Sequence, residues 1–183
     1  MLKKILIGIG VVFLLFVLWV VYGLFIAEPV SPPATASFNE GGLEITIDYS
    51  QPSKKGRLLF GTAESGALQP YGKYWRLGAN AATDITFNQD VNFGGKSVAA
   101  GTYRMYAVPG EESFEVVLNS ESGVFFGAAE PDYDLDLVSV YAPIQNSATE
   151  IETFIIGFSS IDSGANINFS WDNILFSVPV TTE

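Results

Sequence analysis

The sequence contains neither histidine nor cysteine among its 183 residues. No Ser-His-Asp or Cys-His catalytic arrangement can therefore form, and zinc, copper and haem sites that need imidazole or thiolate ligands are excluded. Without cysteine there are no disulfides, so an apolar core has to stabilise the fold. Any catalysis would have to use carboxylates, Tyr, Lys, Ser or Thr, and no cofactor is expected.

Positive charge is scarce as well. Nine Lys and Arg residues stand against twenty Asp and Glu, which gives a formal net charge of −11. Two of the nine, Lys3 and Lys4, lie at the N-terminus, so the rest of the chain is more acidic still. Binding to phosphate backbones depends on Lys and Arg that displace counterions. Nucleic acid is therefore not an expected partner, and anionic lipid headgroups are repelled.

An uncharged, strongly apolar run occupies residues 5–26. A helix of that length, at about 1.5 Å per residue, reaches roughly 33 Å and can cross the bilayer core of about 30 Å. Because positive side chains precede it within residues 1–4, that end is predicted to be cytoplasmic and the C-terminal domain to lie outside. We thus expect a single-pass signal anchor in the cytoplasmic membrane, with the lipid bilayer as partner of residues 5–26. The alternative is a cleaved signal peptide and a secreted domain, which the bulky Phe25 before Ala27 disfavours.

The remainder of the chain predicts a linker and one domain. Residues 27–37 carry three prolines among small residues and predict a short extended linker. Residues 38–183 have the length of a single extracytoplasmic domain.

Apolar and polar residues alternate along this domain, for example from Leu43 to Tyr49 and again over 114–118, 154–158 and 166–171. Such alternation is typical of strands with one face on a core, and it predicts that Trp171 is buried. Nine or ten such strands are expected, with no helical period after the anchor. The predicted fold class is all-β, an antiparallel β-sandwich of jelly-roll-like form. Tight turns are predicted at Gly94-Gly95, Pro109-Gly110 and Asp172-Asn173.

Residues 69–82 break this pattern with two glycines, a proline and three aromatic residues. Irregular segments on a β scaffold commonly hold binding sites, and five of the nine cationic residues lie within residues 54–76. We therefore predict a ligand site made of Arg57, Tyr71, Trp75, Arg76 and Asn80.

In that site the two guanidinium groups would clamp a carboxylate, phosphate or sulfate, and an aromatic ring would stack on the ligand. A structural interpretation stays open. In it, Arg76 pairs with an internal acid such as Asp84, Trp75 belongs to the core, and Asn80 is a turn residue.

Three alternating acids, Asp132, Asp134 and Asp136, form a calcium candidate, because calcium prefers carboxylate oxygens. The EF-hand pattern fails, since Leu137 stands where glycine is required and Pro143 where glutamate is required. On a strand, all three acids would point to one face, where they could instead form a solvated edge that discourages pairing with other chains. No metal site is assigned to the chain.

Several short strings along the domain form a joint motif. They are DYSQPSKKGR (48–57), FG (60–61), PYGKYWRLGANAAT (70–83), FGGK (93–96), AGTY (100–103) and VPGE (108–111). Together they resemble the signature of a bacterial domain-of-unknown-function family, number 2911. The resemblance runs from about residue 36 to residue 180 and implies a secreted or envelope β domain without an assigned activity. It also suggests that Arg57, Trp75, Arg76 and Asn80 belong together. The sequence departs from the family pattern at Phe125-Phe126-Gly127, where Trp-Gly is expected, and in its anchor-like N-terminus.

These features together predict a membrane-anchored extracytoplasmic binding or interaction module for an anionic or carbohydrate-like ligand, or for a protein. Two alternatives stay open. One is a carboxylate-dependent enzyme that acts on glycans, which needs two acids at a defined separation across the sugar. The other is a structural component of an envelope complex.

Overall fold

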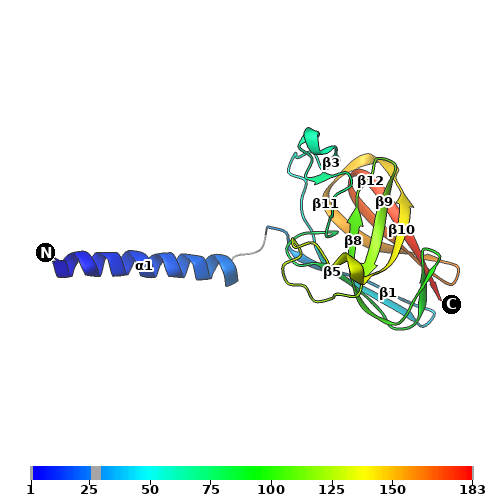
Figure 1. Ribbon diagram of the computed structural model, residues 1–183, viewed down its shortest axis with the longest axis horizontal. Coiled ribbons are helices and arrows are strands. Elements are labelled where there is room, and N and C mark those ends of the chain that lie inside the picture. Colours follow the sequence, from blue (N-terminus) through cyan, green and yellow to red (C-terminus); the bar gives the residue numbers. More distant parts are fainter. Residues whose placement is uncertain (1, 26–29, 183) are drawn as a thin grey trace. The chain divides into compact units, whose positions relative to one another are not determined.

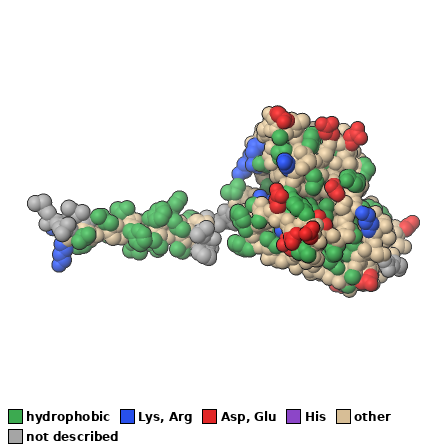
Figure 2. Space-filling view, viewed as in Figure 1, with side chains coloured by type: hydrophobic (Ala, Val, Ile, Leu, Met, Phe, Trp, Pro, Cys, Tyr) green, Lys and Arg blue, Asp and Glu red, His purple; other side chains and the backbone are tan. Residues whose placement is uncertain are grey.

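The computed structural model describes residues 2–25 and 30–182 and divides the chain into two units, Met1–Val30 and Ser31–Glu183. The first unit contains helix α1 (Leu2–Phe25) (Figure 1). Hydrophobic side chains cover the described part of this helix, with Lys only at its N-terminal end (Figure 2). It is the one described helix long and apolar enough to cross a membrane. The helix begins before the predicted residue 5, and residue 26 lies outside the described residues.

The second unit is built from twelve described strands and two short 3-10 turns. The strands are β1 (Pro33–Glu40), β2 (Leu43–Ser50), β3 (Phe60–Gly61), β4 (Gln69–Pro70), β5 (Thr83–Phe87), β6 (Val91–Phe93), β7 (Lys96–Val98), β8 (Gly101–Val108), β9 (Ser113–Asn119), β10 (Asp136–Pro143), β11 (Gln145–Ile161) and β12 (Gly164–Thr182), and the turns are η1 (Ala63–Ser65) and η2 (Tyr133–Leu135).

Two antiparallel sheets form the domain. The first has the strand order β1-β2-β5-β8-β9-β10 and the second the order β11-β12-β6-β7, while β3 and β4 make a short parallel pair. One hydrophobic core contains side chains from both sheets. The prediction of an all-β antiparallel sandwich is confirmed.

Alternation explains the core. Ile45 and Ile47 of β2, Phe114 and Val116 of β9, and the matching positions of β11 and β12 are buried. Trp171 is 2% exposed, as predicted. Trp171 faces the core because buried and less buried residues alternate without a break from Ala165 to Trp171.

The predicted turns at Gly94-Gly95 and Pro109-Gly110 are confirmed, because each joins two antiparallel strands. The predicted turn at Asp172-Asn173 is wrong, since β12 continues through it. Asp172 has a φ of +56°, and the register with β11 shifts there. The buried positions also switch from odd to even numbers between Trp171 and Phe176. These residues form a β-bulge, which uses the same positive-φ residue types as a tight turn.

The linker boundary also differs from the prediction. Residues 33–37 belong to β1, which pairs with β2 along its whole length. Pro33 is tolerated because it begins an edge strand, where its missing N–H breaks no ladder. Ala34 and Ala36 then pack against the core. The small residues at 33–37 therefore form the first part of a strand and not an extended linker.

Candidate functional site

Trp75, the expected stacking residue, lies in the core with 1% of its surface exposed. Its ring stacks on Trp171 at 5.8 Å between centroids and makes edge contacts with Phe60, Phe114 and Phe154. A ligand cannot reach this ring. The predicted stacking role of Trp75 is wrong, and its structural interpretation is correct.

Arg57 and Arg76 each bind backbone carbonyls of nearby residues. Arg57 donates through Nε to Lys54 O (2.9 Å) and through Nη2 to Ser53 O (2.6 Å). Arg76 donates through Nη1 to Asn80 O at 3.1 Å. Each guanidinium therefore donates to carbonyls within four residues of its own position, and the two groups share no hydrogen-bond partner within residues 30–182.

Asn80 and Tyr71 also have local roles. Asn80 adopts a φ of +60°, which is the left-handed turn conformation that asparagine tolerates. Its side-chain amide donates to Ser31 O at 3.0 Å and so ties this turn to the start of the domain. Tyr71 is half-buried, and its backbone N–H donates to Gly61 O at 2.8 Å. Of the predicted site residues, the structure thus brings Arg76 and Asn80 into contact, buries Trp75 in the core, and gives Arg57 and Tyr71 other hydrogen-bond partners.

The acids Asp132, Asp134 and Asp136 do not share one strand face. Asp132 caps turn η2 by accepting a hydrogen bond from the backbone N–H of Asp134 at 3.1 Å. Asp136 accepts hydrogen bonds from Tyr106 and Asn119 instead. Among the residues that the structure describes, no group of three or more acids is arranged to hold a metal ion. The expectation of a common face is wrong because the cap bends the chain.

A different polar feature crosses the whole first sheet. Six polar side chains occupy directly paired positions on successive strands, from β1 to β10. They share the sheet face opposite the core, because the intervening residues such as Ile47 and Ile85 are fully buried. We call these six residues the polar row. They are Thr35, Asp48, Asp84, Arg104, Asn119 and Asp136.

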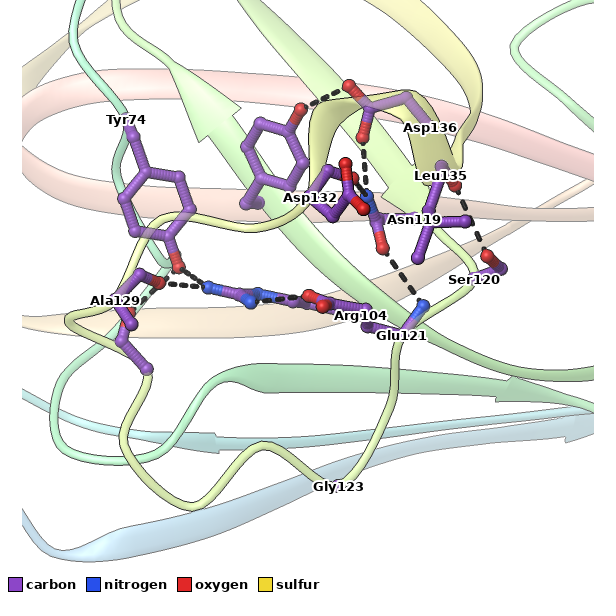
Figure 3. Close-up of polar contacts among 12 residues, drawn as sticks. Tyr74, Arg104, Asn119, Ser120, Glu121, Gly123, Ala129, Asp132, Leu135 and Asp136 are labelled. Atoms are coloured by element: carbon purple, nitrogen blue, oxygen red, sulfur yellow. Dashed lines mark hydrogen bonds and ion pairs between the residues drawn. The ribbon is translucent and has the colours of Figure 1, made fainter.

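Arg104 is the buried centre of the polar row, with 1% of its surface exposed. Its guanidinium donates to Glu121 Oε2 (2.9 Å), Tyr74 Oη (2.6 Å) and Ala129 O (2.6 Å), as Figure 3 shows. It also lies 5.3 Å from the centre of the Tyr74 ring. Tyr74 in turn donates to Gly127 O at 2.9 Å. Arg104 therefore fastens the segment 121–130 across the outer face of the sheet.

Asn119 and Asp136 complete one end of the row (Figure 3). The Asn119 amide donates to Asp136 Oδ1 and to Asp132 O, both at 2.8 Å. Tyr106 donates to Asp136 Oδ2 at 2.7 Å. Burial and the neighbouring Asp136 carboxylate raise the pKa of Tyr106, so this phenol remains a donor at neutral pH. This end is a saturated hydrogen-bond network.

The other end of the polar row opens into a cleft of about 440 Å³. Asp48 and Asp84 lie side by side there, because they are register partners on β2 and β5. Asp48 Oδ1 accepts a hydrogen bond from Thr35 Oγ1 at 2.6 Å. Phe125 lies on the rim and is 91% exposed. The cleft is lined by Pro33, Ala34, Thr35, Asp48, Tyr49, Ser50, Ala81, Ala82, Asp84 and residues 123–125.

Asp84 is electrostatically unusual. Burial raises the pKa of its carboxyl, and the charge of Asp48 adds to this effect, while the Gly123 N–H and the Arg104 charge oppose it. Asp84 Oδ2 accepts a hydrogen bond from Gly123 N at 2.7 Å. Asp84 Oδ1 is buried and accepts no hydrogen bond from the described residues. Arg104 Nε is also buried and donates no hydrogen bond to them. Buried polar groups without a hydrogen-bond partner and groups with a shifted pKa are both frequent at functional sites.

Replacing Asp84 with asparagine is expected to raise Tm by a few degrees at pH 7. The folded state binds the Asp84 proton more tightly than the unfolded state, whose carboxyl titrates near its ordinary value of 3.8. The protonated Asp84 carboxyl therefore stabilises the folded state. This stabilisation is fully present below pH 3.8 and is lost as the pH rises through the raised pKa. The gain from Asp84→Asn should shrink between pH 7 and pH 4. Thermal unfolding at several pH values checks this, with Asp162→Asn at an exposed turn as the control. A constant difference across this range would contradict the assignment.

Sequence reasoning missed Asp48, Asp84 and Arg104. Their proximity comes from pairing between strands far apart in the chain, which no local motif encodes. One signal was available, because Arg104 is the one charged residue of the strand Gly101–Val108, in which most neighbouring positions are apolar or aromatic. An arginine inside a buried strand is almost always paired.

The polar row and the cleft both lie within the region that comparison with protein families identifies. A family model described as "Protein of unknown function (DUF2911)" matches residues 31–180, which confirms the resemblance seen in the motifs. No curated protein and no solved structure matches the chain. The chain therefore belongs to the DUF2911 family of proteins of unknown function.

Proposed function

We propose that the protein is a membrane-anchored binding module whose cleft takes an uncharged, hydroxyl-rich ligand of the carbohydrate type. The proposal rests on one observation, the pairing of Asp48 with Asp84 in the lining of the 440 Å³ cleft. Carboxylates accept hydrogen bonds from hydroxyl groups, and the volume lies in the usual range for small-ligand sites. The exposed ring of Phe125 offers an apolar face on the rim.

The same carboxylates argue against an anionic ligand in this cleft. Two acids at adjacent positions repel a phosphate, sulfate or carboxylate, and the guanidinium groups of Arg57 and Arg76 are engaged by their own loops. A neutral saccharide avoids this repulsion. Between the anionic and the carbohydrate-like ligand considered from the sequence, we therefore choose the carbohydrate.

The location belongs to the proposal. Helix α1 acts as an uncleaved signal anchor in the cytoplasmic membrane, with residues 1–4 inside and the β domain on the periplasmic or extracellular side. Support comes from the length and apolar character of the helix and from the positive charges before it. The alternative location is a secreted domain released by signal cleavage.

Ligand binding should appear as a rise in Tm of the full chain in detergent. A ligand that binds only the folded state stabilises it by RT ln(1 + [L]/Kd), or about 2.7 kcal/mol at a hundredfold excess over Kd. Neutral mono- and disaccharides at millimolar concentration should raise Tm of the unaltered chain, whereas inorganic phosphate and glucuronate should not. Asp48→Asn should abolish the rise.

The matched control for Asp48→Asn is Asp162→Asn, which makes the same chemical change at the exposed turn between β11 and β12. It should keep the full response to the sugar. The proposal fails if no saccharide stabilises the unaltered chain, or if both variants lose the response to the same extent.

A second candidate function is hydrolysis of glycans. It is favoured by one observation, the pairing of a carboxyl of raised pKa, Asp84, with the neighbouring Asp48 in an open cleft. Directly opposite residues in an antiparallel pair have Cβ atoms about 4.5–5.5 Å apart, so their carboxyl groups can reach the separation of about 5–5.5 Å that a retaining glycosidase has between its general acid and its nucleophile. Release of reducing ends that both Asp48→Asn and Asp84→Asn abolish would establish this activity over simple binding.

A further inference from the structure

Two adjacent phenylalanines are displayed on the surface of the domain. Phe125 is 91% exposed and Phe126 is 69% exposed. Both belong to residues 123–127, which we call the Phe loop. Exposed apolar patches commonly mark a surface that contacts a membrane or another protein.

The Phe loop is held firmly at its base. The backbone N–H of Gly123 donates to Asp84 Oδ2 (2.7 Å), and that of Gly127 donates to Asn80 O (3.0 Å). Val124 O accepts a hydrogen bond from Ala82 N at 3.0 Å. A Cβ atom at position 127 would collide with the Ala82 backbone, so glycine is required for this close approach. The backbone that carries the two exposed rings is therefore held to the domain by three hydrogen bonds.

The Phe loop lies beside the point where the chain enters the domain. Asn80 accepts the hydrogen bond from Gly127 through its carbonyl, and its side chain donates to Ser31 O at 3.0 Å. Only residues 26–30 separate Ser31 from Phe25, the last residue of α1. At about 3.3–3.6 Å per residue, even a fully extended chain keeps Ser31 within about 22 Å of the helix end.

We propose that the Phe loop contacts the outer surface of the lipid bilayer, with Phe126 inserted among the lipids and the rim of the cleft at the membrane surface. Aromatic side chains are favoured at the membrane–water interface, and the anchor brings this surface within reach. The occupant is an uncharged or zwitterionic lipid surface, because the net charge of −11 repels anionic headgroups. The inference rests on the membrane anchor of the proposed function.

The absence of cysteine makes a direct test simple. Ala128→Cys places one thiol on the exposed turn that follows Phe126, and Asp162→Cys places one on the turn between β11 and β12. That second turn lies near Gly41, at the end of β1 opposite to Pro33. Each full-length variant is labelled with an environment-sensitive fluorophore and reconstituted in phosphatidylcholine nanodiscs, with and without lipids that carry a nitroxide on the acyl chain.

We expect nitroxide lipids to quench the label at position 128 and to leave the label at position 162 unchanged. Adding Phe126→Ser to the Ala128→Cys variant should abolish the quenching while Tm stays the same, because the Phe126 ring packs little against the domain. Equal quenching at the two positions, or quenching that persists without Phe126, would overturn the proposal.

The test is independent of the ligand. Phe126 is not among the residues that line the cleft, so Phe126→Ser should retain the saccharide-induced rise in Tm in detergent. Quenching without any saccharide response would leave the bilayer contact standing and reject the ligand class. A saccharide response without quenching would support the ligand class and reject the bilayer contact.

Discussion

Replacing Trp75 with alanine is expected to destabilise the domain by about 3–5 kcal/mol, the usual cost of emptying a large aromatic site in a core. The ring is 1% exposed and contacts four other aromatic rings, including Trp171 and Phe60. Its removal therefore leaves a cavity between the two sheets that aromatic neighbours cannot fill by small movements. Urea unfolding followed by circular dichroism measures the change.

The phenylalanine variants of Trp75 and Trp171 separate packing from hydrogen bonding. Trp75 Nε1 is buried without a hydrogen-bond partner in the described residues, whereas Trp171 Nε1 donates to Glu152 O at 3.2 Å. Trp171→Phe should therefore cost about 1 kcal/mol more than Trp75→Phe, the net value of one hydrogen bond. A loss below about 1 kcal/mol for Trp75→Ala would show that this ring is not part of the core.

Replacing Arg104 with methionine is expected to cost about 3 kcal/mol. Removing one partner of a buried ion pair usually costs about 3–5 kcal/mol, and the lower end applies because the Glu121 side chain is 31% exposed. The loss would also leave Ala129 O and Tyr74 Oη without their charged donor. The segment 121–130 should then detach from the sheet, which we expect to increase its amide hydrogen exchange.

Arg57→Met is the matched control for Arg104→Met, because it removes the same group from an exposed position whose hydrogen bonds, within the described residues, go to backbone carbonyls. It should cost less than about 1 kcal/mol. Arg104→Lys should fall between the two, since it keeps the charge and loses the planar fork. Similar losses for Arg104→Met and Arg57→Met would mean that Arg104 does not fasten the segment.

Local sequence patterns were sufficient to predict the longer strands, because a side chain on a strand needs only its neighbours at i±2 to indicate a buried face. The alternation from Leu43 to Tyr49 predicted β2, and the alternation before Trp171 predicted the first half of β12. Nine or ten strands were expected and the structure describes twelve, because β1 begins within the expected linker and two-residue strands such as β3 show no alternation. The failure at Asp172 has a physical reason. A bulge and a tight turn can both contain a residue of positive φ, and only the pairing with β11 distinguishes them.

The candidate site could not be predicted in the same way. Lys54 lies close in sequence to Arg57 but forms ion pairs with Asp172 at 2.7 Å and Glu150 at 3.2 Å, on the other sheet. Acids of the second sheet therefore neutralise Lys54, and it does not join a ligand site with Arg57. The partners Asp48, Asp84 and Arg104 meet only after three strands have paired in the correct order.

The position of β1 has a mechanical consequence for the membrane anchor that we propose. This edge strand pairs with a single neighbour, β2, and its first residues, Pro33 to Thr35, form one wall of the cleft. A pull transmitted through the proposed anchor would reach Pro33 before any other strand residue. Because Pro33 pairs with Ser50 at the open end of the β1–β2 hairpin, such a force would separate the two strands one pair at a time from that end. Tension along the chain would thus act first on this wall of the cleft.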